Sequence, residues 1–404
     1  MIKQQRPCDR LFLLVGSNSF PNYLTSLILK PRSIILFYSP ETEKIKDNLK
    51  DGLKEKLADS SIDEICVRKA TVATETYKVF HEAFRKTFHE TSRAANIHLN
   101  YTGGTKIMAA NARMAFKDAG GEDKQASYLD ERKGILRFDD DYEIKLSTES
   151  FELKLDDILK LHGIKKRAKE KTPFSSIFKD AGRISELELA DKILKLVCNE
   201  PKYAKELYDN CQEASAINLG KELKKLLDTD LSTVCFTEDG WSKDIRKKVA
   251  AFFKGGWLEI WCSELLRGML KGNEVSVSVN CIRANDRSFE IDLAVIYEHR
   301  LYVISCTTAS DLKLCKSKLF EVAIRARQLG GDLARSALVC LCHGSDSNGS
   351  YAGQLRKDIE DIWDASNTPQ VFNLDDLKDW EGYSGKRNTK LLKDWIASDS
   401  VITR

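Results

Sequence analysis

The first part of the chain, to about residue 145, alternates between two kinds of segment, and this alternation constrains the fold more than any other feature. Apolar runs rich in β-branched and aromatic residues, typical of buried strands, lie at Arg10–Val15, Ser33–Tyr38, Ile62–Val67 and Ile97–Tyr101. Helix-like stretches such as Glu41–Leu57 and Glu75–Phe88 stand between them. This order predicts βαβ units and a parallel sheet covered by helices on both faces, a Rossmann-like domain. Its ligand is expected beyond the carboxyl ends of the strands.

Length and composition set the outer limits of the fold. A chain of 404 residues suggests two or three domains at the usual ~150 residues each. With 42% hydrophobic and 31% charged residues it can bury real cores, so extensive disorder is excluded. All six tryptophans follow residue 240, which indicates that the later region is built separately. The formal net charge of +3 neither requires nor excludes a polyanionic partner.

Cysteine usage and hydropathy predict the environment of the protein. The 11 cysteines are spread without CxxC pairs, and the apolar run Leu11–Val15 is too short for a signal peptide. No segment approaches the ~20 apolar residues that a membrane span requires. We therefore expect a soluble, reduced, cytoplasmic protein that binds no membrane.

Three regions are expected, at residues 1–148, 149–244 and 245–404. In the middle region, the basic run Lys165–Lys171 is interpreted as a solvated linker. Helical periodicity from residue 184 and a hairpin-like end around Val234–Phe236 and Trp241 resemble a winged helix. Because no row of Arg or Lys marks one helix as a groove reader, we favour a helical spacer. Nucleic-acid binding and dimer packing remain alternatives.

The fourth expected strand ends in a glycine turn. Thr102-Gly103-Gly104-Thr105-Lys106 leads into the helical run Ile107–Phe116. The glycines let a ligand approach the backbone, Thr105 can cap the helix, and a helix N-terminus favours an anion. The spacing GxxxxGK[ST] is absent, which disfavours an NTPase. A tight turn that binds nothing is the alternative, but the small polar loop Gly16-Ser17-Asn18 after the first strand favours a ligand at this rim.

These two loops carry a resemblance to a known domain family. Ser17-Asn18, the turn at residues 102–106 and its continuation Ile107-Met108-Ala109-Ala110-Asn111-Ala112 are similar to the CARF domain, the CRISPR-associated Rossmann fold that senses cyclic oligoadenylates in type III CRISPR immunity. The resemblance implies a homodimer that binds cyclic tetra-adenylate across a two-fold axis. The binding residues that it implies are Gly16, Ser17, Asn18, Thr102, Gly103, Gly104, Thr105, Lys106 and Asn111.

The last region is also α/β, but it is organised differently. It opens with a helix at Gly255-Gly256-Trp257 and continues through strands Phe289–Ile296, Leu301–Cys306 and Ala337–Cys342, with a helix at about Lys318–Gln328. Glu290 and Asp292 share one face of the first of these strands, where a metal could bind. Two acidic residues on a strand are more often simply solvated, so the order of the elements has to decide.

That order, a helix with Glu, a strand with Asp, a second strand and a helix, resembles the PD-(D/E)XK nuclease core. The resemblance implies Mg²⁺ or Mn²⁺ held on carboxylates beside a lysine, with DNA, RNA or both as substrate. It implies Glu259 and Asp292 as catalytic and metal-binding residues. Glu264 competes with Glu259, because helical projection places Glu264 nearer the apolar side of the same helix.

The second strand departs from the family pattern. The family has Glu-x-Lys there, and the corresponding triplet in this chain is Ser305-Cys306-Thr307. Ser305 or the Cys306 carbonyl could supply the missing metal ligand. The missing lysine could have moved onto the next helix.

Two lysines compete for that role. Lys316 and Lys318 lie about 200° apart around a helix, so at most one faces the strands. We select Lys318, which precedes the apolar pair Leu319-Phe320, and Gln328 could reach the same cleft.

CARF, helical spacer and nuclease-like domain follow one another in the order of a CRISPR ancillary nuclease. The sequence therefore predicts a homodimeric, metal-dependent nuclease that cyclic tetra-adenylate activates. The alternative is a ligand-responsive nucleic-acid- or partner-binding protein whose nuclease fold has lost catalysis, and Ser305 and Thr307 favour it. The spacing of cysteines and histidines supports neither a zinc quartet nor a Ser/His/Asp triad.

Overall fold

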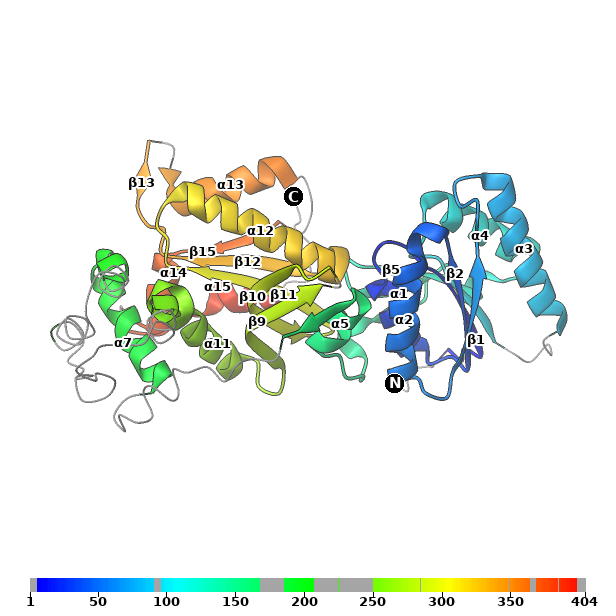
Figure 1. Cartoon of the computed structure of the whole chain (residues 1–404), viewed down its shortest axis with the longest axis horizontal. Coiled ribbons are helices and arrows are strands. Elements are labelled where there is room, and N and C mark those ends of the chain that lie inside the picture. The colour runs from blue at the N-terminus through cyan, green and yellow to red at the C-terminus, as the bar shows by residue number, and fades with distance from the viewer. Residues whose placement is uncertain are drawn as a thin grey trace.

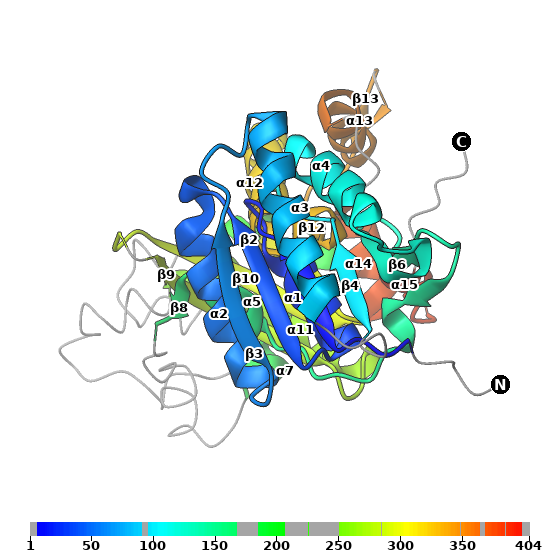
Figure 2. The same ribbon diagram turned by 90° about the vertical axis from the view of Figure 1, so that its right-hand side faces the viewer.

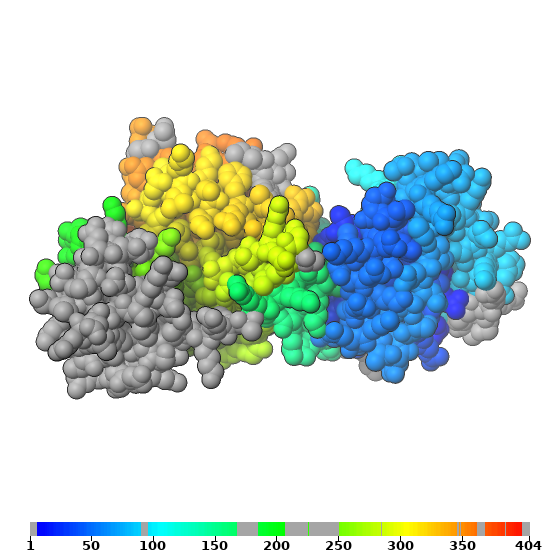
Figure 3. Space-filling view, viewed as in Figure 1, coloured from blue at the N-terminus to red at the C-terminus, as the bar shows by residue number. Residues whose placement is uncertain are grey.

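The computed structural model describes residues 6–90, 96–167, 185–206, 225, 250–283, 285–347, 349–363, 368–383 and 385–397. The described chain is a mixed α/β protein with a seven-stranded sheet, a six-stranded sheet and a two-stranded ribbon. The two large sheets follow one another along the long axis of the molecule (Figure 1). The bodies built on them touch, as the space-filling view shows (Figure 3).

The N-terminal sheet has the strand order β3-β2-β1-β4-β5-β6-β7. The strands are β1 (Arg10–Leu14), β2 (Ser33–Tyr38), β3 (Ser61–Cys66), β4 (Ile97–Asn100), β5 (Ala126–Asp130), β6 (Ile135–Phe138) and β7 (Glu143–Lys145). β1 to β5 are parallel, whereas β6 and β7 add an antiparallel edge. The predicted parallel sheet is confirmed, and the antiparallel extension is new.

Four helices cover the two faces of this sheet: α1 (Phe20–Leu29), α2 (Glu43–Lys56), α3 (Ala73–Glu90) and α4 (Lys106–Asp118). α1 and α2 lie on one face, and α3 and α4 lie on the other (Figure 2). Successive residues of β1 alternate between these faces, so Leu11 and Leu13 pack into one core and Phe12 and Leu14 into the other.

The C-terminal sheet has the order β15-β12-β11-β10-β9-β8. Its strands are β8 (Ile164–Lys166), β9 (Glu274–Arg283), β10 (Ser288–Tyr297), β11 (Arg300–Thr307), β12 (Arg335–Cys340) and β15 (Gln370–Phe372). β11, β12 and β15 are parallel, and β8 to β11 are antiparallel. The short ribbon consists of β13 (Ser345–Asp346) and β14 (Gly349–Ser350).

The helices of this region again form two layers. α12 (Leu312–Gly330) and α13 (Tyr351–Trp363) pack on one face, and α7 (Glu186–Asn199), α11 (Trp257–Met269), α14 (Leu374–Glu381) and α15 (Lys390–Ala397) pack on the other. A π-helical turn, Phe252–Gly256, leads into α11. No described helix is long and apolar enough to cross a membrane.

The segment after the N-terminal sheet joins the two bodies. α5 (Leu155–Leu161) follows it, and β8 then pairs with β9 as an edge strand of the C-terminal sheet. The interpretation of Lys165–Lys171 as a solvated linker is therefore wrong at its start: Lys165 and Lys166 have exposed side chains, but their backbone belongs to the sheet. The expected hairpin at Val234–Phe236 and Trp241 lies outside the described residues.

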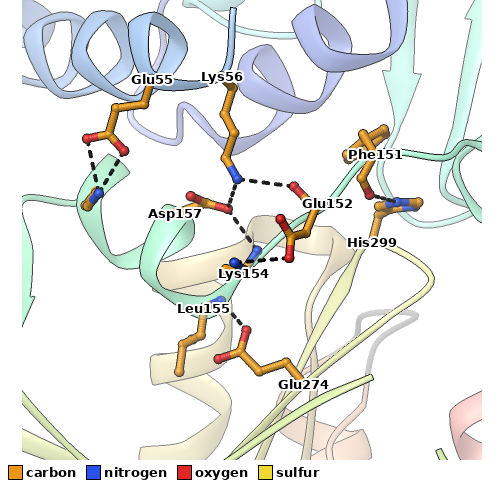
Figure 4. A network of polar contacts seen from close by, with 10 residues as sticks. Glu55, Lys56, Phe151, Glu152, Lys154, Leu155, Asp157, Glu274 and His299 are labelled. Atoms are coloured by element: carbon orange, nitrogen blue, oxygen red, sulfur yellow. Dashed lines mark hydrogen bonds and ion pairs between the residues drawn. The ribbon is translucent and has the colours of Figure 1, made fainter. Parts of the chain in front are cut away.

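Polar contacts fix this segment to both bodies (Figure 4). Lys56 at the end of α2 pairs with Asp157 at 2.9 Å, and Glu274 of β9 accepts a hydrogen bond from the Leu155 backbone at 2.9 Å. The ring nitrogens of His299, in the turn between β10 and β11, lie 2.9 Å from the carbonyl oxygen of Leu146 and 3.0 Å from that of Phe151. The two bodies are therefore held together by buried apolar packing and by polar contacts.

Candidate functional site

The first candidate site lies where the strand order of the N-terminal sheet reverses. β1 and β4 are neighbours, and their connections leave in opposite directions along the sheet. Loops at such a switch point leave a crevice at the carboxyl edge of the sheet. Gly16 after β1 meets Gly104 after β4 there, because a Cβ on Gly16 would lie 2.9 Å from the Gly104 backbone nitrogen. The two loops that the sequence singled out therefore form one surface.

The glycines are required by close backbone approach. A Cβ on Gly103 would lie 2.0 Å from the carbonyl oxygen of Leu14, and Gly104 has φ +76°. Asn22 of the buried helix α1 donates to the same Leu14 carbonyl at 2.8 Å. Its buried Oδ1 has no hydrogen-bond partner in the described structure and lies 3.1 Å from the Cβ position of Gly103. The turn is thus wedged against β1 and α1.

The amino end of α4 opens beside this turn. Thr105 caps it, its Oγ1 accepting from the Met108 backbone at 3.1 Å, and Lys106 and Ser17 are exposed. Thr102 and Asn111 have other partners: Thr102 Oγ1 accepts from the Leu129 backbone at 2.7 Å, and Asn111 donates to the Ile107 carbonyl at 2.8 Å. The arrangement offers backbone donors, a helix N-terminus and a lysine to an anion.

The second candidate site is built around Asp292 in β10. Its Oδ2 accepts from Ser305 Oγ and from the Cys306 backbone, each at 2.8 Å, both from the neighbouring strand β11. Burial raises the pKa of this carboxyl above its ordinary value, although the two hydrogen bonds oppose the rise. Ser305, at the position where the PD-(D/E)XK resemblance leads one to expect a glutamate, therefore donates to Asp292, whereas a glutamate there would repel it.

Glu259, in the first turn of α11, lies in the same region. Its Oε2 accepts from Ser278 Oγ at 2.6 Å. Ser278 stands between Val277 and Val279, which pair with Leu293 and Ile291, so it lies opposite Asp292 on the ladder. Its φ of +46° is uncommon for a non-glycine residue and marks local backbone strain. Ser278 is a site residue that sequence reasoning missed.

The competing glutamate points elsewhere. Glu264 pairs with Arg267 at 3.6 Å on the surface of α11, with about half of its side chain exposed. The pKa of the Cys306 thiol is raised by its hydrogen bond with the Cys262 thiol and by burial, and the charges of Asp292 and Glu259 add to that rise. The structure thus brings Glu259, rather than Glu264, near Asp292.

The lysines of α12 diverge as helical geometry requires. Lys316 pairs with Asp358 of α13 at 2.8 Å. Burial raises the pKa of Asp292, and the positive charge of Lys318 partly offsets that rise, whereas the charge of Glu321 adds to it. Lys318 also pairs with Glu321 at 3.5 Å. The placement of Gln328 in this cleft is contradicted, because it lies ~15 Å further along α12 and accepts from Arg283 at 3.0 Å.

The oxygen atoms around Asp292 could hold a divalent cation with only a few protein ligands. Among the described residues, no three His, Cys, Asp or Glu side chains form a metal-binding group. Mg²⁺ needs only one or two carboxylates, since water and substrate phosphates complete its shell. Both hydrogen bonds to Asp292 reach Oδ2, so Oδ1 together with the Cys306 carbonyl and Glu259 provides oxygen donors.

Solved structures place this architecture in a known class. Protein VC1899 from Vibrio cholerae superimposes with a TM-score of 0.66 at 16% identity, over 97% of this chain and 98% of that chain. Can2 from Sulfobacillus thermosulfidooxidans, solved with cyclic tetra-adenylate, gives 0.64 at 16% identity over 96% and 97%. A type III CRISPR defence DNA nuclease activated by cyclic oligoadenylate gives 0.50 at 19% identity, over 85% of this chain and 47% of that chain. The chain therefore shares its two-sheet α/β fold with these three proteins.

One segment of the chain also matches a protein-family model. Residues 246–367 match the family model for the Card1-like endonuclease domain. No curated protein matches the chain. The resemblance to a CRISPR ancillary nuclease is thus confirmed by the family model and by the fold.

Proposed function

We propose that this protein is a metal-dependent nuclease of type III CRISPR defence that cyclic tetra-adenylate activates. The observation that carries the proposal is the Card1-like endonuclease match over residues 246–367, which contains both Asp292 and Lys318. The activator binds at the loops after β1 and β4, since the N-terminus of α4 and Lys106 suit phosphate groups. DNA and RNA both remain candidate substrates.

The domain division follows from this function. Residues 1–148 form the CARF sensor and 245–404 the main part of a PD-(D/E)XK nuclease domain; the region 149–244 holds a winged-helix-like spacer, but its strand β8 belongs to the C-terminal sheet and its helix α7 packs on that sheet. Two chains pair through their sensors, because a two-fold ring of phosphates suits two symmetric helix N-termini. Only an activator that binds the active arrangement more tightly than the inactive one can switch the enzyme.

The nuclease site uses few groups. Asp292, Glu259, the Cys306 carbonyl and Ser305 would hold Mg²⁺ or Mn²⁺, which polarises the scissile phosphate and lowers the pKa of a water. Lys318 stabilises negative charge near Asp292.

A second candidate function is favoured by the triplet Ser305-Cys306-Thr307. Compared with the pattern Glu-x-Lys, Ser305 lacks the negative charge of the glutamate and donates a hydrogen bond to Asp292 instead, and Thr307 lacks the positive charge of the lysine. Such a site suits a protein that binds nucleic acid or a partner in response to the activator without cleaving it. The two functions differ in one observable, the breaking of a phosphodiester bond.

Cleavage separates the two candidates. Purified protein is mixed with supercoiled DNA or single-stranded RNA, with and without Mn²⁺ and cyclic tetra-adenylate. Cleavage that needs both additions, and that Asp292→Asn abolishes while activator binding is retained, supports the nuclease. Asp286→Asn is the matched control, because Asp286 lies exposed in the turn before β10, where asparagine tolerates its φ of +57°. Activator-dependent binding without cleavage supports the second function.

A further inference from the structure

One contact joins the candidate sensor loop to the candidate nuclease helix. Asn18, in the loop after β1, and Glu131, just after β5, both reach Gly331 at the end of α12. A Cβ on Gly331 would lie 2.2 Å from Asn18 Nδ2 and 2.4 Å from Glu131 Oε2. Asn18 belongs to the loops proposed to bind the activator, so the proposed activator site directly touches the end of α12 in the C-terminal body.

Glu131 is anchored to the backbone that follows α12. Its Oε2 accepts from the Asp332 N–H at 3.1 Å, and Asp332 in turn pairs with Arg327 at 3.3 Å. Gly331 caps α12, donating its N–H to the Arg327 carbonyl with φ +62°. Glu131 therefore holds the last turn of α12 through the backbone that caps it.

α12 connects this end to the candidate nuclease site. The helix spans 19 residues, or ~28 Å, and it runs along the C-terminal sheet toward the N-terminal body (Figure 1). Lys318 stands in the first half of this helix, and its positive charge partly offsets the rise that burial causes in the pKa of Asp292. Leu319, Val322, Ala326 and Leu329 are buried on the sheet, so a displacement of the capped end displaces packed side chains along the helix.

We infer that Asn18, Glu131 and Gly331 form the contact through which occupancy of the sensor rim is transmitted to α12 and thus to Lys318. The inference rests on the proposed function, since it names the regulation of that site. An anion at the rim attracts the amide N–H donors of Asn18 and repels the carboxylate of Glu131. Both effects act on the residues that cap α12. The activator therefore binds one position of the α12 end more tightly than another, and this difference in affinity can shift the equilibrium between the two positions.

Other groups set the charge of this contact. Burial raises the pKa of Glu131, and the nearby carboxylate of Asp332 adds to that rise. The backbone N–H groups of Asp332 and Leu333 and the guanidinium of Arg327 lower it. A further negative charge from the activator adds to a cluster that already holds two carboxylates. The contact is therefore sensitive to an anion bound nearby.

Tryptophan provides a readout that does not depend on catalysis. All six tryptophans follow residue 240, so a fluorescence change on activator binding reports a change in the part of the chain after residue 240. Hydrogen exchange of the Gly331, Asp332 and Leu333 amides reports the cap itself. Calorimetry measures affinity for cyclic tetra-adenylate in the same full-length samples.

Glu131→Gln tests the inference, with Glu152→Gln as the control because the Glu152 side chain is 70% exposed. In wild type and in the control, cyclic tetra-adenylate should change exchange of the 331–333 amides at least threefold and alter tryptophan fluorescence. Glu131→Gln should bind within threefold of wild-type affinity and lose at least half of both responses. A wild-type response in Glu131→Gln, or binding without any response in wild type, overturns the inference. Absence of calorimetric binding in wild type overturns the proposed sensor function itself, and the inference with it.

Discussion

Glu131→Gln should stabilise the protein at neutral and higher pH. Burial beside Asp332 raises the pKa of Glu131 from its ordinary 4.5 to about 7. The folded state then binds this proton more tightly than the unfolded chain, so the contribution of Glu131 to the free energy of unfolding is fully present below pH 4.5 and is lost as pH rises through about 7. At ~1.4 kcal/mol for each pKa unit, the difference amounts to at most ~3.5 kcal/mol. Partial exposure of Glu131 screens the charge, which leaves about 1–2 kcal/mol.

Urea unfolding at about pH 5, 6, 7 and 8 measures this effect, followed by tryptophan fluorescence and far-UV circular dichroism. The stability advantage of Glu131→Gln over wild type should be smallest at the lowest pH and should level off above about pH 7. Glu152→Gln, at an exposed carboxylate, should show no such trend. An advantage that stays constant from pH 5 to pH 8 would refute the burial of the Glu131 charge at the contact with α12.

Three further outcomes follow from the two sites. Gly103→Ala should destabilise the protein by ~1–3 kcal/mol in thermal melts and abolish activator binding, because its Cβ would lie 2.0 Å from the Leu14 carbonyl oxygen; Gly268→Ala, where a Cβ meets nothing within 4 Å, should be tolerated. Lys318→Ala should slow single-turnover cleavage at least tenfold with little change in substrate affinity. Lys316→Ala should cleave at the wild-type rate because Lys316 pairs with Asp358; the reverse ranking would mean that Lys316 faces the phosphate.

The parallel strands were predictable because burial on both faces leaves a nearly continuous apolar run. The prediction Ser33–Tyr38 matches β2 at both ends, and Arg10–Val15 exceeds β1 by one residue. α1 was not predicted: all ten of its residues are buried, so it shows no polar face. β8 was not predicted because two of its three residues are lysines, which are typical of a linker as well as of an edge strand. Only the pairing with β9 identifies it as a strand.

The candidate sites divide in the same way. The glycine turn and Asp292 stand in local motifs, so the sequence displays them. Ser278 was missed because β9 was not recognised, and only its position opposite Asp292 gives it a role. Glu131 contacts Asp332 across 201 residues, and no local period can reveal such a contact. Gln328 was misplaced because ~15 Å of α12 separates it from Lys318.

Calorimetric titration with cyclic tetra-adenylate tests the sensor function most directly. The account predicts saturable binding of one ring to two chains, as a two-fold axis requires, and at least tenfold weaker binding by Lys106→Ala after loss of a charge-assisted phosphate contact. Lys117→Ala, at an exposed lysine near the other end of α4, should bind as wild type does. Absence of binding, or wild-type affinity in Lys106→Ala, would contradict the account.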